Sequence, residues 1–137
     1  MSDARYVKGF VERYGAHDFD GVADCLSDEG FERLGPYLDV IASKQEYVDF
    51  LRRVVPTLGP RYELLPVRIT SGADGDTAYA ELIERVEVDG VLTDIPEVIV
   101  YDLAPDGRIA RMNLYLKQPG GVAPAGGRDS MGATESA

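Results

Sequence analysis

The sequence predicts an α+β fold, with three helices first and an antiparallel sheet after them. In the first half of the chain, apolar residues recur at the three- and four-residue spacing of amphipathic helices. In the second half, they fall into β-rich runs separated by short turns of glycine, aspartate and proline. Helices and strands that are segregated along the chain are typical of α+β domains.

The first helix is expected over residues 3–14, and a shorter second helix is expected after Asp18. The apolar residues of the first helix share one face: Val7, Phe10, Val11 and Tyr14. Gly15 breaks this pattern, and the Asp18 side chain can cap the second helix. That helix turns Cys25 inward, as a small core residue rather than a nucleophile.

The third helix has the clearest start in the chain, and one short strand is expected before it at residues 31–34. Ser43 and Glu46 form a capping box, in which each side chain can accept from a free backbone N–H group. Apolar residues then hold helical spacing: Tyr47, Phe50, Leu51, Val54, Val55 and Leu58. Gly59 and Pro60 end this helix.

The rest of the folded region is expected to form a four-strand antiparallel meander. Its strands are predicted at residues 61–70, 77–88, 91–103 and 108–117. Asp89 and Gly90 indicate a tight hairpin, and Pro96 indicates a bulge or an edge position. The composition changes after residue 119, so we expect one domain over residues 1–119 and a flexible tail over 120–137.

Composition excludes several classes of partner and site. With 24 acidic and 14 basic side chains, the net charge of −10 repels phosphate backbones, so no nucleic acid is expected as a partner. No apolar run approaches the roughly 20 residues of a membrane span. Cys25 is the only cysteine, which excludes a disulfide within the chain and a cysteine-rich metal site. His17 is the only histidine and is expected in a solvated loop, and these features together point to the cytoplasm.

The order of the predicted elements resembles the nuclear-transport-factor-2-like superfamily, which includes ketosteroid isomerases, SnoaL-like polyketide cyclases and limonene epoxide hydrolases. The resemblance covers roughly residues 3–118. Its best local match is the closing hairpin at residues 106–112, Asp-Gly-Arg-Ile-Ala-Arg-Met, which is similar to the Gly-Lys/Arg-Ile hairpin of many members. Residues 84–88, Glu-Arg-Val-Glu-Val, resemble a Glu-Arg-Val-Asp-Val segment of limonene epoxide hydrolases.

The resemblance implies a cone-shaped curved antiparallel sheet, packed on the three N-terminal helices and enclosing a small-molecule pocket. In this fold, the alternation of side chains along each strand assigns the pocket lining. The expected ligand-binding residues are Phe10, Tyr14, Leu34, Tyr47, Phe50, Ile83, Ile99, Tyr101, Met112, Leu114 and Leu116. Arg111, Asn113 and Tyr115 would lie on the other face of the sheet, where relatives commonly form a dimer, so a homodimer is expected.

Three ionisable residues are the predicted catalytic set: Arg85, Glu87 and Glu97. In epoxide hydrolases of this fold, an arginine between two aspartates activates water and protonates the epoxide. Arg85 and Glu87 match the first two members of that pattern. The third member falls at Leu114, so Glu97 would have to substitute for it from the neighbouring strand. The plainer alternatives are a partly exposed Arg85–Glu87 ion pair and a solvated Glu97 beside Pro96.

The other enzyme patterns of the fold are incomplete in this sequence. The catalytic tyrosine, base and oxyanion-hole acid of ketosteroid isomerases fall near Phe10, Leu34 and Ile99, which cannot transfer protons. The pocket histidine of SnoaL-type cyclases has no counterpart, because His17 lies elsewhere.

Three functional hypotheses follow. The first is a small enzyme that isomerises, cyclises or hydrates a moderately apolar metabolite by acid–base chemistry, without a metal or an organic cofactor. The second is a binding module that holds such a ligand without turnover. The third is a dimeric scaffold whose cone is filled by side chains.

Overall fold

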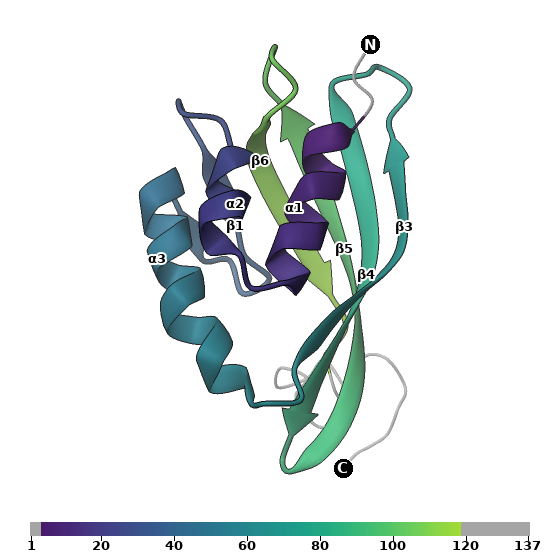
Figure 1. Cartoon of the computed structure of the whole chain (residues 1–137). Helices are drawn as coiled ribbons and strands as arrows, with labels where there is room; N and C mark the ends of the chain where they lie inside the picture. Colours follow the sequence, from purple (N-terminus) through teal and green to yellow (C-terminus); the bar gives the residue numbers. More distant parts are fainter. Residues whose placement is uncertain (1–3, 119–137) are drawn as a thin grey trace.

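The computed structural model describes residues 4–118 and forms two layers (Figure 1). The helical layer contains α1 (Arg5–Gly15), α2 (Phe19–Asp24) and α3 (Lys44–Val54). All three helices lie on one face of a single six-stranded sheet (Figure 1). This arrangement confirms the predicted α+β fold with three N-terminal helices. The tail predicted for residues 120–137 lies outside the described residues.

Two helix starts depend on the predicted side-chain caps. The Gly21 N–H donates to Asp18 Oδ1 at 2.9 Å, and the Glu46 N–H donates to Ser43 Oγ at 3.1 Å. Each bond satisfies a donor that the first helical turn leaves free. The third helix ends earlier than predicted, because Val55–Leu58 forms a separate 3-10 turn, η1. Pro56 lies in this turn and has no N–H to donate to an α-helical ladder.

The predicted meander forms the larger part of the sheet. Its strands are β3 (Glu63–Ser71), β4 (Thr77–Val88), β5 (Val91–Leu103) and β6 (Ile109–Leu116), each antiparallel to the next. The β4–β5 turn is the predicted hairpin, since Val88 pairs with Val91. Asp89 and Gly90 between them have φ angles of 51° and 80°, a backbone conformation that aspartate tolerates and glycine adopts freely.

The sheet has two more strands than the predicted meander. β1 (Glu32–Leu34) pairs in parallel with β6, and β2 (Val40–Ile41) pairs with β1, which gives the order β2-β1-β6-β5-β4-β3. The short strand expected at residues 31–34 is therefore confirmed. A two-residue strand such as β2 is too short to show an alternating pattern in the sequence.

The core lies between the helices and the inner face of the sheet. Its largest fully buried side chains include Phe10 of α1, Leu51 of α3 and Tyr101 of β5. Cys25 is also buried there, as expected, and His17 is exposed in the loop after α1. No helix within residues 4–118 combines the length and apolar character needed to cross a membrane.

Candidate functional site

A cavity of about 200 Å³ opens between the helices and the inner face of the sheet. Most of its lining is aliphatic or aromatic, and the ionisable side chains are Tyr14, Arg33, Tyr37, Tyr47, Glu84 and Glu97. The volume is below the roughly 300–1,000 Å³ typical of pockets for drug-sized molecules, so the cavity suits a smaller ligand. A cavity of this size also argues against a cone that is filled by its own side chains.

Glu84 of β4 and Glu97 of β5 form an acidic pair on the cavity wall. Leu82 stands directly opposite Glu97 in the ladder, so Glu84 lies one diagonal step away on the same face. Glu97 is only 3% exposed. Burial, the negative charge of Glu84 and a hydrogen bond with the Glu84 side chain raise the pKa of Glu97 to about 9. Glu97 therefore holds its proton at neutral pH.

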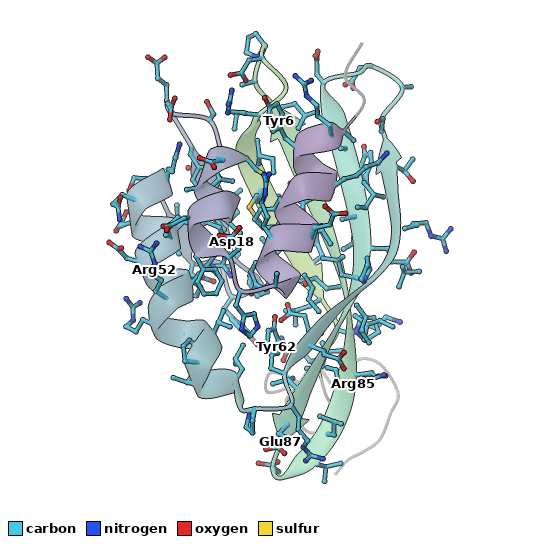
Figure 2. All side chains as sticks on the ribbon, viewed as in Figure 1. Tyr6, Asp18, Arg52, Tyr62, Arg85 and Glu87 are labelled. Atoms are coloured by element: carbon cyan, nitrogen blue, oxygen red, sulfur yellow. The ribbon has the colours of Figure 1, made fainter. Side chains whose placement is uncertain are left out.

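Tyr62 bonds to Glu84 and contacts a second tyrosine, Tyr14 of α1. The Tyr62 hydroxyl donates to Glu84 Oε1 at 2.8 Å and lies 3.3 Å from the Tyr14 hydroxyl, which can donate to it in turn. Figure 2 shows Tyr62 between the helical layer and the strands. Burial, followed by the nearby acidic and phenolic groups, raises the pKa of both tyrosines well above their ordinary value. Both are therefore hydrogen-bond donors throughout the physiological pH range.

Arg33 of β1 is the positive charge on the cavity lining. The residue is 8% exposed, and its Nη1 donates to Asp39 Oδ2 at 2.8 Å. The guanidinium carbon lies 5.0 Å from the centre of the Phe50 ring, within the range of a cation–π contact. The same positive charge acts on Glu97 and favours its ionised form, against the larger effect of burial.

Three buried side-chain atoms have no hydrogen-bond partner within residues 4–118: Arg33 Nε, Glu97 Oε2 and the Tyr101 hydroxyl. Two of these atoms belong to residues that line the cavity. Buried polar atoms are normally paired, so these three atoms are exceptions in the packed interior. No three His, Cys, Asp or Glu side chains gather as a metal site in the described part of the chain.

The predicted grouping of Arg85, Glu87 and Glu97 is not found. Arg85 Nε donates to Asp94 Oδ1 at 2.7 Å, and a second bond joins the guanidinium to Glu63 at 3.4 Å, on the outer face of the sheet. Glu87 is exposed near the β4–β5 turn and pairs with Arg61 (Figure 2). The expected inward orientation of Arg85 and Glu87 is therefore wrong.

The reason is the alternation of side chains along β4. Ala78, Ala80 and Leu82 are buried on the inner face, so every second residue from Ala78 onward points inward, including Glu84. Ile83, on the odd-numbered set, faces the other way and does not line the cavity. The expected inward position of Ile83 is therefore also wrong.

The remaining predicted positions divide into two groups. The structure brings nine of them to the cavity: Phe10, Tyr14, Tyr47, Phe50, Glu97, Ile99, Met112, Leu114 and Leu116. Leu34 instead lines a separate groove on the other side of β1, because Arg33 takes the inward position. Tyr101 points inward but is packed in the core beside Phe10, outside the cavity lining.

The sequence analysis missed Arg33, Tyr62 and Glu84 as site residues. A signal was present for Glu84, since four inner-face neighbours at every second position are apolar: Ala78, Ala80, Leu82 and Val86. Phe31, the residue before β1, is buried like Arg33 two positions later, which indicates an inward position for Arg33. Tyr62 lies just before β3, and the pairing of Leu64 with Glu84 in the β3–β4 ladder brings it next to Glu84.

Comparisons with known proteins identify the fold. No family model matches the sequence, and no curated protein is significantly similar to it. Among solved structures, Bal32a from a soil-derived mobile gene cassette matches with a TM-score of 0.73 and 13% identity, over 84% of this chain and 88% of that one. A limonene-epoxide-hydrolase-like epoxide hydrolase of M. tuberculosis matches with a TM-score of 0.65 and 24% identity, over 82% and 80%.

The chain has the nuclear-transport-factor-2-like fold. The predicted resemblance is thus confirmed for the architecture. A third structure of this fold, the epoxide hydrolase/cyclase-like enzyme SalBIII, matches with a TM-score of 0.66 and 18% identity, over 82% of this chain and 88% of that one. The nuclear-transport-factor-2-like fold carries several unrelated activities, so the chemistry has to be argued from the cavity itself.

Proposed function

We propose that the protein is a small-molecule enzyme that uses acid–base chemistry, without a metal or an organic cofactor, on a moderately apolar metabolite. The observation that carries this proposal is the hydrogen-bonded Glu84–Glu97 pair on an otherwise mostly apolar cavity wall. Two carboxyl groups whose environments differ can act as an acid and a base at the same pH.

The burial of the two residues assigns their roles. Glu97 holds a proton at neutral pH and is the general acid. Glu84 accepts a hydrogen bond from Tyr62 and is the general base. Because the two side chains are hydrogen-bonded, a proton taken up by Glu84 can return to Glu97 and restore the starting state.

Of isomerisation, cyclisation and the hydration of an epoxide, the opening of an epoxide fits this pair best. Glu97 donates its proton to the ring oxygen as the C–O bond breaks. Glu84 removes a proton from water, or from a hydroxyl group of the same molecule, as the new C–O bond forms. The similarity to an epoxide hydrolase and to an epoxide hydrolase/cyclase-like enzyme supports this choice. Isomerisation uses the same two proton transfers with a different substrate.

The second candidate is a binding protein without turnover. The observation that favours it is the apolar character of Phe10 and Ile99, which line the cavity where ketosteroid isomerases carry catalytic groups. Homodimer formation, cytoplasmic location and the absence of a cofactor remain predictions from the sequence.

The test compares glutamine variants on the two faces of β4. Glu84→Gln and Glu97→Gln keep the side-chain size, and Glu87→Gln is the matched control because Glu87 is exposed on the same strand as Glu84. With small epoxides such as cyclohexene oxide, we expect hydrolysis by the wild type and the control. Each cavity variant should lose about 10²–10⁴-fold in kcat/KM.

Retention of turnover in both cavity variants would contradict the acid–base pair. Native mass spectrometry of the purified protein addresses the second candidate. A retained ligand that the protein leaves chemically unchanged during incubation supports a binding module, whereas its conversion supports the enzyme.

A further inference from the structure

Tyr37 borders the cavity and is nevertheless open to solvent. The residue is 68% exposed, whereas every other lining residue within 4–118 is buried or half-buried. A residue that meets both the cavity and the solvent lies at the opening. We propose that Tyr37 is a specificity-determining residue whose ring contacts the part of the ligand that extends out of the cavity. The inference deepens the proposed function and rests on it, since the cavity that holds the reacting pair is taken as the binding site.

Backbone contacts hold Tyr37 at the opening and leave its ring free. The turn of residues 35–39 follows β1, and the Gly35 N–H donates to the backbone oxygen of Asp39 at 2.7 Å. The Tyr37 N–H donates to Asp39 Oδ1 at 3.2 Å, and Asp39 Oδ2 accepts from the buried Arg33 at 2.8 Å. Within residues 4–118, the ring and the hydroxyl of Tyr37 have no hydrogen bond and no contact with another ring. A ligand can therefore reach the ring without breaking a contact of the turn.

The size of the cavity decides which ligands meet Tyr37. A volume of about 200 Å³ encloses a group of roughly the size of one six-membered ring. A second ring or a chain on the same molecule has to extend through the opening, where Tyr37 and its neighbour Pro36 belong to the lining. A small molecule that is enclosed completely does not need this contact.

The chemistry of the opening favours an apolar group at this end of the ligand. An exposed tyrosine ring presents apolar surface to water, and covering that surface with another apolar group is favourable. An aromatic group gains further from an offset or edge-to-face contact with the ring. The expected substrate is therefore an elongated apolar molecule. Its reacting group is enclosed beside Glu84 and Glu97, and a second apolar group lies against Tyr37.

The experiment measures the binding of two matched alcohols, cyclohexanol and trans-4-phenylcyclohexanol, by ¹H–¹⁵N NMR titration at pH 7. The first alcohol can be enclosed by the cavity, and the second adds a phenyl ring that extends toward Tyr37. We expect the wild type to bind the phenyl alcohol more tightly than cyclohexanol. Tyr37→Ala should weaken binding of the phenyl alcohol about fivefold and leave that of cyclohexanol unchanged. Tyr37→Phe keeps the ring and should bind both alcohols like the wild type.

Leu38→Ala is the matched control. Leu38 is the next residue of the same turn and is 96% exposed, but it does not line the cavity. Its replacement should leave the affinity for both alcohols unchanged. Both alanine variants keep their backbone N–H groups, so the hydrogen bond from residue 37 to Asp39 is retained.

Several results would overturn the inference. These are no binding of the phenyl alcohol, binding to the wild type that is no tighter than that of cyclohexanol, an unchanged affinity in Tyr37→Ala, and equal weakening of both alcohols in that variant. A loss in Leu38→Ala as large as the loss in Tyr37→Ala would also overturn it, because the effect would then arise from the turn and not from the ring.

Failure of the proposed function gives a different result. The two alcohols carry no epoxide ring, so their titration does not depend on turnover. Full turnover in both Glu84→Gln and Glu97→Gln would contradict the acid–base pair and leave the dependence on Tyr37 unaffected. Loss of this dependence with intact Glu97-dependent turnover would overturn only the assignment of Tyr37.

Discussion

Glu84 and Glu97 share a hydrogen bond across β4 and β5 as diagonal neighbours on one face, with Leu82 directly opposite Glu97 in the ladder. The diagonal offset brings two acidic side chains from adjacent strands onto one wall of an apolar cavity. The pair explains the raised pKa of Glu97 and gives the cavity its chemical character.

The stability of the protein should fall as the pH rises toward 9. The pKa of Glu97 is about 9 in the folded state against an ordinary value of 4.5, so the folded protein binds the proton more tightly than the unfolded chain. This contribution is fully present below pH 4.5 and is lost as the pH rises through about 9. Urea denaturation at pH 5, 7 and 9 should show a smaller dependence in Glu97→Gln. Parallel pH profiles for variant and wild type would contradict the assignment.

Tyr62→Phe should destabilise the protein by about 1–2 kcal/mol. The substitution removes the hydrogen bond that Glu84 Oε1 accepts at 2.8 Å and leaves a partly buried carboxylate short of a donor. Tyr14→Phe is the matched control, since it removes only the longer contact of 3.3 Å between the two hydroxyls and should cost less. Urea denaturation at pH 7 measures both. An equal loss of stability in the two variants would count against a special role of Tyr62.

Val54→Phe should reduce ligand binding or turnover at least 10-fold without loss of the fold. Val54 of α3 lines the cavity and is partly exposed, so a larger side chain there can enter the free volume. Thermal unfolding should give a melting temperature equal to or above that of the wild type, because the ring fills space that the wild type leaves open. Undiminished turnover of the same substrate would place the reaction outside this cavity.

Arg85→Gln should leave turnover unchanged. The Arg85 guanidinium bonds to Asp94 and Glu63 on the outer face of the sheet and does not reach the cavity. Steady-state kinetics beside Glu97→Gln should show a large loss for the cavity residue and none for Arg85. A comparable loss in Arg85→Gln would restore the outer face as a candidate site.

Ser43→Ala should cost about 1 kcal/mol of folding free energy. The Ser43 hydroxyl accepts from the Glu46 N–H at the start of α3, and alanine leaves that donor without a partner. Ser43→Thr retains the hydroxyl and should keep most of the stability in the same denaturation experiment. If the two variants are equally destabilised, the effect does not arise from the cap.

The amino-acid sequence was enough to predict the fold class, the caps and half of the cavity lining. These features depend on interactions between residues that are close in the chain: the spacing of Val7 and Phe10 in α1, the Ser43 cap of α3, and the Asp89–Gly90 turn that sets the β4–β5 register. The alternation along β5 and β6 likewise placed Glu97, Ile99 and Met112 inward, because the period of a strand is fixed at two residues.

Which charged side chains meet depends on how the strands and helices pack together. The inner face of β4 was predicted wrongly, because the likeness to an epoxide-hydrolase segment placed Arg85 inward, whereas the apolar alternation places Glu84 inward. A shift of one residue along a strand moves every side chain to the opposite face. The contact of Tyr62 with Glu84 depends on the pairing of β3 with β4, and the inward position of Arg33 depends on the parallel pairing of β1 with β6. Such contacts join residues far apart in the chain, so no local spacing encodes them.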